Sequence, residues 1–203
     1  RSVSMSGLDV RAFVEQQVRE IRETLGKEKA LIAVSGGVDS TVSGVLTYRA
    51  IGNNLLCVFI EDNFMRLGEP EGVEKALSAP PLNLRIRVLD ERARFMQALS
   101  GLGDAEEKRK AFREAFYTAL SKIVREMKAR FLIQGTIAAD VIETKRGVKT
   151  QHNVLEQIGI DTSDRYGYDL VEPLRDLYKD QVRLVAKALG LPIEGVNRRP
   201  FPG

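Results

Sequence analysis

The chain has 203 residues, enough for one domain with a substantial apolar core. Apolar residues make up 43% and charged residues 29% of it, as in ordinary globular proteins, and no apolar run approaches membrane-spanning length. The N-terminal residues contain no signal-peptide core, so we expect a cytoplasmic protein that acts without a membrane.

The net charge is +3 and the pI is about 9.0, a balance that would suit a nucleic-acid partner. However, acidic and basic residues are mixed along most of the chain. Phosphate-rich small ligands explain the excess of positive charge equally well. We therefore expect small-molecule substrates and no nucleic acid.

A single cysteine, Cys57, excludes an intrachain disulfide and any CxxC site in this chain. Cys57 stands in the apolar run over 55–60. We interpret it as a small buried hydrophobic side chain rather than a nucleophile.

The first part of the chain predicts a helix, a strand, a second helix and a second strand. Apolar residues recur at helical spacing from Val10 to Leu25, and Gly26 is a usual helix end. A strand is predicted over about 29–34, a helix over 38–51 after a glycine turn, and a strand over 55–60.

The same alternation continues to the end of the chain. We predict, in order, a short helix over 69–78, a strand with one wetter face over 84–89, helices over 91–99 and 104–128, a strand over 130–133, a helix over 138–144, a strand over 169–171 and a helix from 174 or 175 to 189. The strand with the wetter face is expected nearer the sheet edge. Alternating strands and helices predict an α/β fold, with an open, mostly parallel five-stranded sheet and helices on both faces.

The most informative stretch is AVSGGVDST, from Ala33 to Thr41, between the first strand and its helix. Strand, glycine turn and helix direct backbone N–H groups toward one point, and such a point binds phosphate. Gly36 and Gly37 let an anion approach the backbone closely. Asp39 alone would repel phosphate, so the pattern predicts that it helps to hold Mg²⁺ there. The loop lacks the lysine and the glycine spacing of the Walker loop.

This stretch resembles the SGGxDS pyrophosphate loop of the N-type ATP pyrophosphatase family, whose members split ATP between its α- and β-phosphates. Further strings resemble the ATP pyrophosphatase subunits of GMP synthases, and more closely the archaeal type, whose glutaminase is a separate chain. They follow the family order and are KRK at 108–110, QGTIAADVIET at 134–144, KTQHNV at 149–154, LEQIGID at 155–161, EPL at 172–174 and RPFPG at 199–203.

The resemblance implies an adenine nucleotide alpha-hydrolase-like fold and a ligase that forms a C–N bond. The O2 oxygen of xanthosine 5′-monophosphate (XMP) attacks the α-phosphate of Mg-ATP and releases pyrophosphate. Ammonia from a separate glutamine amidotransferase subunit then displaces AMP and gives GMP. The family also forms homodimers at full length.

The domain organisation follows from the same resemblance. We expect residues 1–203 to be one ATP pyrophosphatase domain, with an N-terminal segment and helix over 1–28 and a lid loop over 145–168. In the family a C-terminal dimerisation domain follows and completes the XMP site, and we expect this chain to lack it.

By resemblance, the residues that bind ATP and Mg²⁺ surround the glycine loop. They are Ser35, Gly36, Gly37, Val38, Asp39, Ser40 and Thr41, with Asp39 as the metal ligand, Gly135 near the ribose or phosphate, and Val34, Ile60 and Met65 beside adenine. The last three are apolar, and a place in the core explains each of them equally well.

The resemblance also implies catalytic roles for residues in or next to the lid. They are Asp140, Glu143, Lys149 and His152. A solvated surface position is the alternative for each charged side chain. His152, the only histidine, could also belong to the core or the surface.

Three other kinds of protein share this loop or this sheet. NAD synthetase uses the same loop, and so do tRNA-modifying thiouridine and lysidine synthetases. Thiolation normally uses paired cysteines, and a tRNA enzyme should carry an RNA-binding domain that is not visible here. A non-catalytic nucleotide sensor is the remaining alternative, and it would release no pyrophosphate.

Overall fold

The computed structural model describes residues 9–34, 37–61, 75, 77–80, 82–145 and 168–191, apart from the side chains of 60, 61 and 142–145. Within these residues, five parallel strands form one sheet in the order β3-β2-β1-β4-β5. They are β1 (Ala30–Ala33), β2 (Leu55–Glu61), β3 (Ile86–Asp90), β4 (Phe131–Ile133) and β5 (Asp169–Val171). The predicted parallel five-stranded sheet is confirmed, and β3 lies at its edge as expected.

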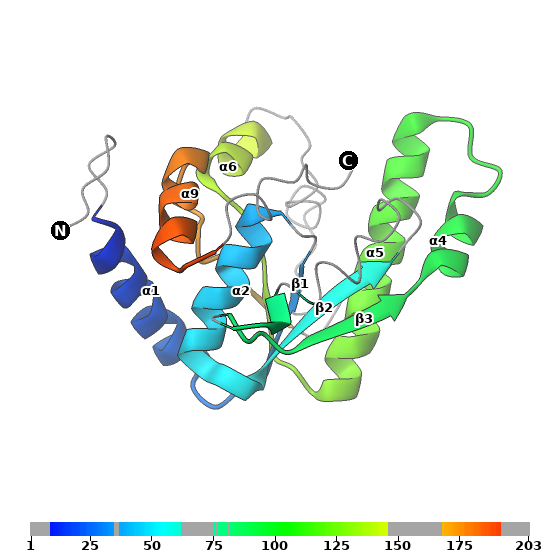
Figure 1. Ribbon diagram of the computed structural model, residues 1–203. Helices are drawn as coiled ribbons and strands as arrows, with labels where there is room; N and C mark the ends of the chain where they lie inside the picture. Colours follow the sequence, from blue (N-terminus) through cyan, green and yellow to red (C-terminus); the bar gives the residue numbers. More distant parts are fainter. Residues whose placement is uncertain are drawn as a thin grey trace.

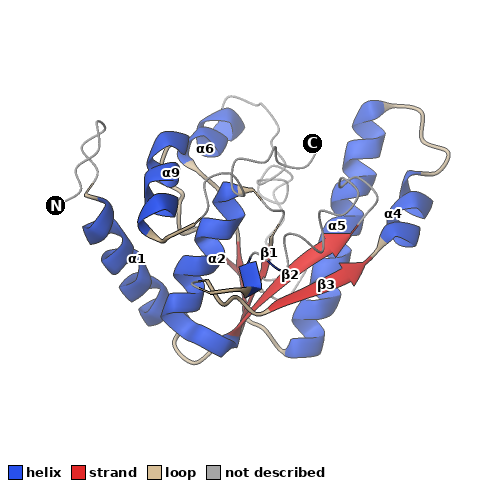
Figure 2. Cartoon of the chain, in the orientation of Figure 1, coloured by secondary structure: helices blue, strands red, loops and turns tan. Residues whose placement is uncertain are grey.

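Helices cover both faces of this sheet (Figures 1 and 2). Their bounds are α1 (Val10–Leu25), α2 (Val38–Ile51), α4 (Arg92–Leu99), α5 (Ala105–Met127), α6 (Ala138–Lys145) and α9 (Lys179–Ala188), with a short 3-10 turn, η1 (Gly52–Asn54), after α2.

The alternation of side chains along β1 divides the core into two layers. Ala30 and Ile32 pack in a cluster with residues of α1, α2 and α9. Leu31, between them, packs in a second cluster with residues of α4 and α5. Successive side chains of a strand point to opposite faces, so a short apolar strand that is buried on both sides contributes to both layers.

Cys57 lies in the first of these layers and is 1% exposed, as predicted from its apolar run. Burial raises the pKa of its thiol from 9.0 to about 12. The thiol is therefore protonated at neutral pH and behaves as a small apolar group.

The strand order reverses at the centre of the sheet. The chain runs outward from β1 to β2 and β3, and then returns to place β4 on the other side of β1. In open α/β sheets, the crevice outside the carboxyl ends of the strands at such a reversal is the usual ligand site. The loops after β1 and β4 meet at this point.

The last helix begins later than predicted. Residues 173–176 form turns, and α9 starts at Lys179, where the backbone N–H of Tyr178 donates to Oε1 of Gln181 over 2.9 Å. Buried Leu174 and Leu177, three positions apart, produced the helical pattern although they belong to the turn. Tyr178, predicted on the buried face, is 51% exposed.

Two other predictions concern segments and spans. The helix expected over 69–78 and the lid expected over 145–168 lie mostly outside the described residues. Among the helices that the structure describes, none is long and apolar enough to cross a membrane.

Candidate active site

The first turn of α2 forms the floor of the candidate site. Gly37 is the N-cap of α2, and its carbonyl accepts hydrogen bonds from the backbone N–H of Thr41 at 3.2 Å and from the Thr41 hydroxyl at 2.8 Å. The Ser40 hydroxyl also donates to this carbonyl, over 3.3 Å. Thr41 is buried, so it stabilises the turn from within rather than from the solvent side.

The loop after β4 presses against this turn at Gly135. A Cβ atom on Gly135 would lie 2.8 Å from the carbonyl carbon of Asp39 and 2.8 Å from the backbone nitrogen of Ser40. Both atoms belong to the main chain and cannot move aside as a flexible side chain could. Glycine is therefore required here by close approach, and the approach joins the ends of β1 and β4.

Asp39 projects from the first turn of α2 and contacts a residue from the other half of the sheet. Its Oδ2 lies 2.8 Å from Nζ of Lys179, the first residue of α9. The Asp39 side chain is only 13% exposed, whereas that of Lys179 is 44% exposed. The other carboxylate oxygen, Oδ1, is buried and has no hydrogen-bond partner among the described residues.

Two backbone contacts bring Lys179 to this position. The backbone N–H of Ala138, at the start of α6, donates to the carbonyl of Leu177 over 2.8 Å. The start of α6 is itself closed by Asp140, whose Oδ2 accepts from the N–H of Ile137 over 2.9 Å. Asp140 therefore stabilises the N-terminus of α6, a local role that its proximity to the lid did not predict.

Thr136 lies between Gly135 and α6. It is fully buried, and its hydroxyl has no hydrogen-bond partner among the described residues. A buried polar group without a partner costs stability unless a ligand, an ion or water completes it. Next to it in the chain, the Gln134 carboxamide donates to the Tyr117 hydroxyl over 2.9 Å and so connects β4 to α5.

The predicted site residues fall into three groups. Gly37, Val38, Asp39, Ser40, Thr41 and Gly135 meet at the ends of β1 and β4. Val34 and Val38 are each 3% exposed and pack in the core, and for Val34 this agrees with the core alternative to an adenine contact. Outside the described residues or side chains lie Ser35, Gly36, Ile60, Met65, Glu143, Lys149 and His152.

Lys179 and Thr136 had no role predicted from the sequence. Thr136 belongs to the quoted QGT string, and Lys179 follows the EPL string by a few residues. Both follow a strand of the sheet, which is the position where α/β proteins place ligand-binding groups. That position was the available signal.

The donor set fits a magnesium ion shared with phosphates. No group of three His, Cys, Asp or Glu side chains among the described residues could hold a metal on its own. Mg²⁺ is commonly held by one or two carboxylates together with the phosphates of its nucleotide. The unpartnered Oδ1 of Asp39, beside the N-terminus of α2, suits this arrangement.

The fold and this geometry define a class of protein: a parallel α/β domain with a phosphate-binding turn at the reversal of its strand order. A family model described as PP-loop domain matches residues 10–193, and the chain belongs to this family.

Curated relatives are similar over almost the whole chain, and all three described here are named as the same subunit of glutamine-hydrolyzing GMP synthase. The chain is 50% identical over 195 residues to that of Sulfurisphaera tokodaii, covering 96% of this chain and 52% of that protein. Those of Methanopyrus kandleri and Pyrococcus abyssi are 49% and 48% identical, cover 96% and 94% of this chain, and are each covered to 60%. The chain thus spans about half to three-fifths of the length of these relatives.

Solved structures with the same fold are much less similar in sequence. The NMN synthetase of Francisella tularensis has a TM-score of 0.71 at 17% identity, over 95% of this chain and 76% of that chain. The ammonia-dependent NAD synthetase of Campylobacter jejuni has a TM-score of 0.70 at 16% identity, over 93% and 77%. They share the adenine nucleotide alpha-hydrolase-like fold of the PP-loop proteins.

Proposed function

We propose that this chain is the ATP pyrophosphatase part of a GMP synthase, in which XMP is adenylated by ATP and then aminated to GMP. The proposal is supported by the 48–50% identity to GMP synthase subunits and by the PP-loop match. The observation that carries it is the pair of opposite charges, Asp39 and Lys179, at the N-terminus of α2.

The reaction has two steps whose atoms and charges balance. The O2 oxygen of XMP bonds to the α-phosphorus of ATP, and the bond from that phosphorus to the bridging oxygen breaks, so that pyrophosphate leaves. Ammonia then attacks C2 of the purine, the bond from C2 to O2 breaks, and AMP leaves. An oxygen on a purine ring is a poor leaving group until it is adenylated.

The residues at the floor of the site suit the first step. Backbone N–H groups at the start of α2 and the helix dipole favour a polyanion there. Asp39 would hold Mg²⁺ together with the phosphates, and the ion would neutralise charge on the departing pyrophosphate. The ammonium of Lys179 lies within reach of the same phosphates and would share that charge.

The other residues of the site would act on position. Thr136 can donate its unpartnered hydroxyl to a phosphate oxygen. Asp140 holds the start of α6. Assistance of adenylation by Glu143, Lys149 and His152 remains part of the proposal, as do adenine contacts by Val34, Ile60 and Met65.

The partners belong to the same proposal. The relatives are named as one subunit of GMP synthase, which implies an enzyme of two subunits, and we propose that the second subunit is a glutamine amidotransferase that supplies ammonia. We also propose that the full-length protein is a homodimer acting in the cytoplasm.

Pyrophosphate release from Mg-ATP tests the function directly. It should be measured with and without XMP, on this chain and on a version extended past Gly203. XMP-dependent release by the extended protein is expected, and Asp39→Ala should abolish it while the far-UV circular dichroism stays unchanged. Release that depends on a nicotinate nucleotide instead of XMP would assign the chain to NAD synthetase chemistry, and no release would assign it to a nucleotide sensor.

A further inference from the structure

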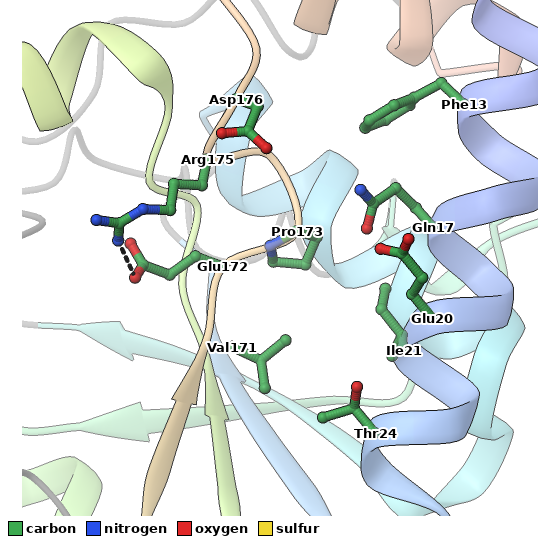
Figure 3. A pocket seen from close by; sticks show the side chains of 10 residues that line it. All are labelled: Phe13, Gln17, Glu20, Ile21, Thr24, Val171, Glu172, Pro173, Arg175 and Asp176. Carbon is green, nitrogen blue, oxygen red and sulfur yellow. Dashed lines mark hydrogen bonds and ion pairs between the residues drawn. The ribbon is translucent and has the colours of Figure 1, made fainter.

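A cavity of about 240 Å³ opens between α1 and the loop that follows β5 (Figure 3). Gln17, Glu20 and Thr24 line it from α1, while Pro173 and Asp176 line it from the loop. None of the residues proposed to bind ATP lines this cavity. It is therefore a separate feature of the molecule, and nothing in the proposed reaction uses it.

The walls of the cavity are rich in hydrogen-bond acceptors and negative charge. Among the described residues, neither Glu20 nor Asp176 has a cationic partner. The cation in the lining is Arg175, which is paired with Glu172 over 2.8 Å. Glu20 is further oriented by the Gln16 carboxamide, which donates to its Oε1 over 3.0 Å. The cavity consequently carries two uncompensated carboxylates.

The base of the cavity is apolar. Ile21 and Pro173 are buried, and Val171 is half-buried beside them. Figure 3 shows the ring of Phe13 at the end of the cavity where Asp176 lies. A ligand that fits must therefore combine an apolar stem with a cationic, multiply donating head.

We propose that this cavity docks an arginine side chain of the ammonia-supplying subunit, an inference that rests on the proposed function. The five N–H donors of a guanidinium suit acceptors spread over two walls, namely Glu20, Gln17 and Asp176. The methylene stem of arginine would pack on Pro173 and Ile21. The Phe13 ring offers its face or edge to the cation at the mouth.

The surroundings favour a protein partner over a small molecule. Tyr178, two residues beyond Asp176, is a large aromatic side chain that is 51% exposed. Tyrosine and arginine are among the residue types that most often dominate binding energy at interfaces. The same loop continues into Lys179, so a docked partner would contact the segment that positions Lys179 beside Asp39.

The test measures the affinity of the two subunits at full length. The double variant Glu20→Gln/Asp176→Asn removes both carboxylates from exposed positions, where the fold does not depend on them. The matched control, Glu15→Gln/Glu23→Gln, makes the same charge change at exposed residues of α1 that do not line the cavity. We expect the dissociation constant to rise at least tenfold in the cavity variant and less than twofold in the control.

GMP synthesis with free ammonia provides the internal check. It should stay within twofold of wild type in both variants, whereas glutamine-dependent synthesis should fall only in the cavity variant at limiting partner concentration. Equal affinities of the cavity variant and wild type would overturn the proposal. Absence of a measurable complex between the wild-type subunits would overturn it as well.

A second approach identifies the docked side chain. Thr24→Trp fills the cavity without changing its charge and should weaken the complex to a similar extent. Alanine substitution of exposed arginines and lysines of the partner should reveal one arginine whose loss is not additive with Glu20→Gln/Asp176→Asn. A lysine with this behaviour would overturn the arginine assignment, and strict additivity everywhere would overturn docking in this cavity.

The two proposals fail in different ways. Tight binding of the partner without XMP-dependent pyrophosphate release would reject the substrate assignment and leave the docking site standing. XMP-dependent release with unchanged affinity of the cavity variant would reject the docking site alone.

Discussion

Nζ of Lys179 lies 2.8 Å from Oδ2 of Asp39, although 140 residues separate the two in the chain. Asp39 belongs to the first turn of the helix after β1, and Lys179 to the helix after β5. The ion pair thus bridges the point where the strand order reverses. It places a partly exposed cation beside the carboxylate expected to hold Mg²⁺, where both can act on one polyanion.

Replacing Lys179 should remove charge stabilisation from the departing pyrophosphate. We expect Lys179→Met to lower kcat/KM for pyrophosphate release by about 100-fold, the usual effect of losing one such donor. Lys187→Met, an exposed lysine in the last turn of α9, should have almost no effect. Unchanged kcat/KM in Lys179→Met would restrict the ion pair to a structural role.

A methyl group on Gly135 should displace the first turn of α2. We expect Gly135→Ala to lower the free energy of unfolding by about 1–3 kcal/mol and to reduce ATP turnover at least tenfold. Gly103→Ala is the control, because a Cβ there meets nothing within 4 Å, and its stability should change by less than about 0.5 kcal/mol. Urea unfolding and pyrophosphate release measure the two effects. Wild-type stability and turnover in Gly135→Ala would contradict the close approach.

Thr136→Val separates a ligand-binding hydroxyl from a structural one. The Thr136 hydroxyl has no protein partner among the described residues, so its loss should leave the stability unchanged or raise it. ATP turnover should nevertheless fall by about 10- to 100-fold, as expected for one hydrogen bond to a charged group. A large loss of stability would show that the hydroxyl bonds within the protein, and full activity would show that it does not face the nucleotide.

The buried thiol of Cys57 predicts both chemical inertness and a pH dependence. With a pKa of about 12, Cys57 should react with Ellman's reagent at pH 8 only after unfolding. The unfolded thiol ionises near its ordinary pKa of 9.0, so stability should fall as pH rises between 9 and 12. In Cys57→Ala this part of the alkaline loss should disappear, because no thiol remains to ionise. Rapid labelling of the native protein would contradict the burial.

Local patterns in the sequence were enough to predict most of the fold. Short apolar runs and helical spacing predicted all five strands and the parallel α/β class, because buried strands and amphipathic helices have distinct periods. The AVSGGVDST string predicted the phosphate-binding turn and a role for Asp39, because both depend on neighbours in the chain. The start of α9 was missed, because Leu174 and Leu177 occur at helical spacing within a turn.

The sequence alone determined the identity of the loop, the alternation of strands and helices and the buried state of Cys57. The tertiary structure decided the strand order, the contact of Gly135 with the backbone of α2, the pairing of Lys179 with Asp39 and the cavity beside α1. The reason is physical: these features join segments far apart in the chain. Residue patterns report the conformation of neighbours, whereas the positions of distant residues depend on how the whole sheet and its helices pack.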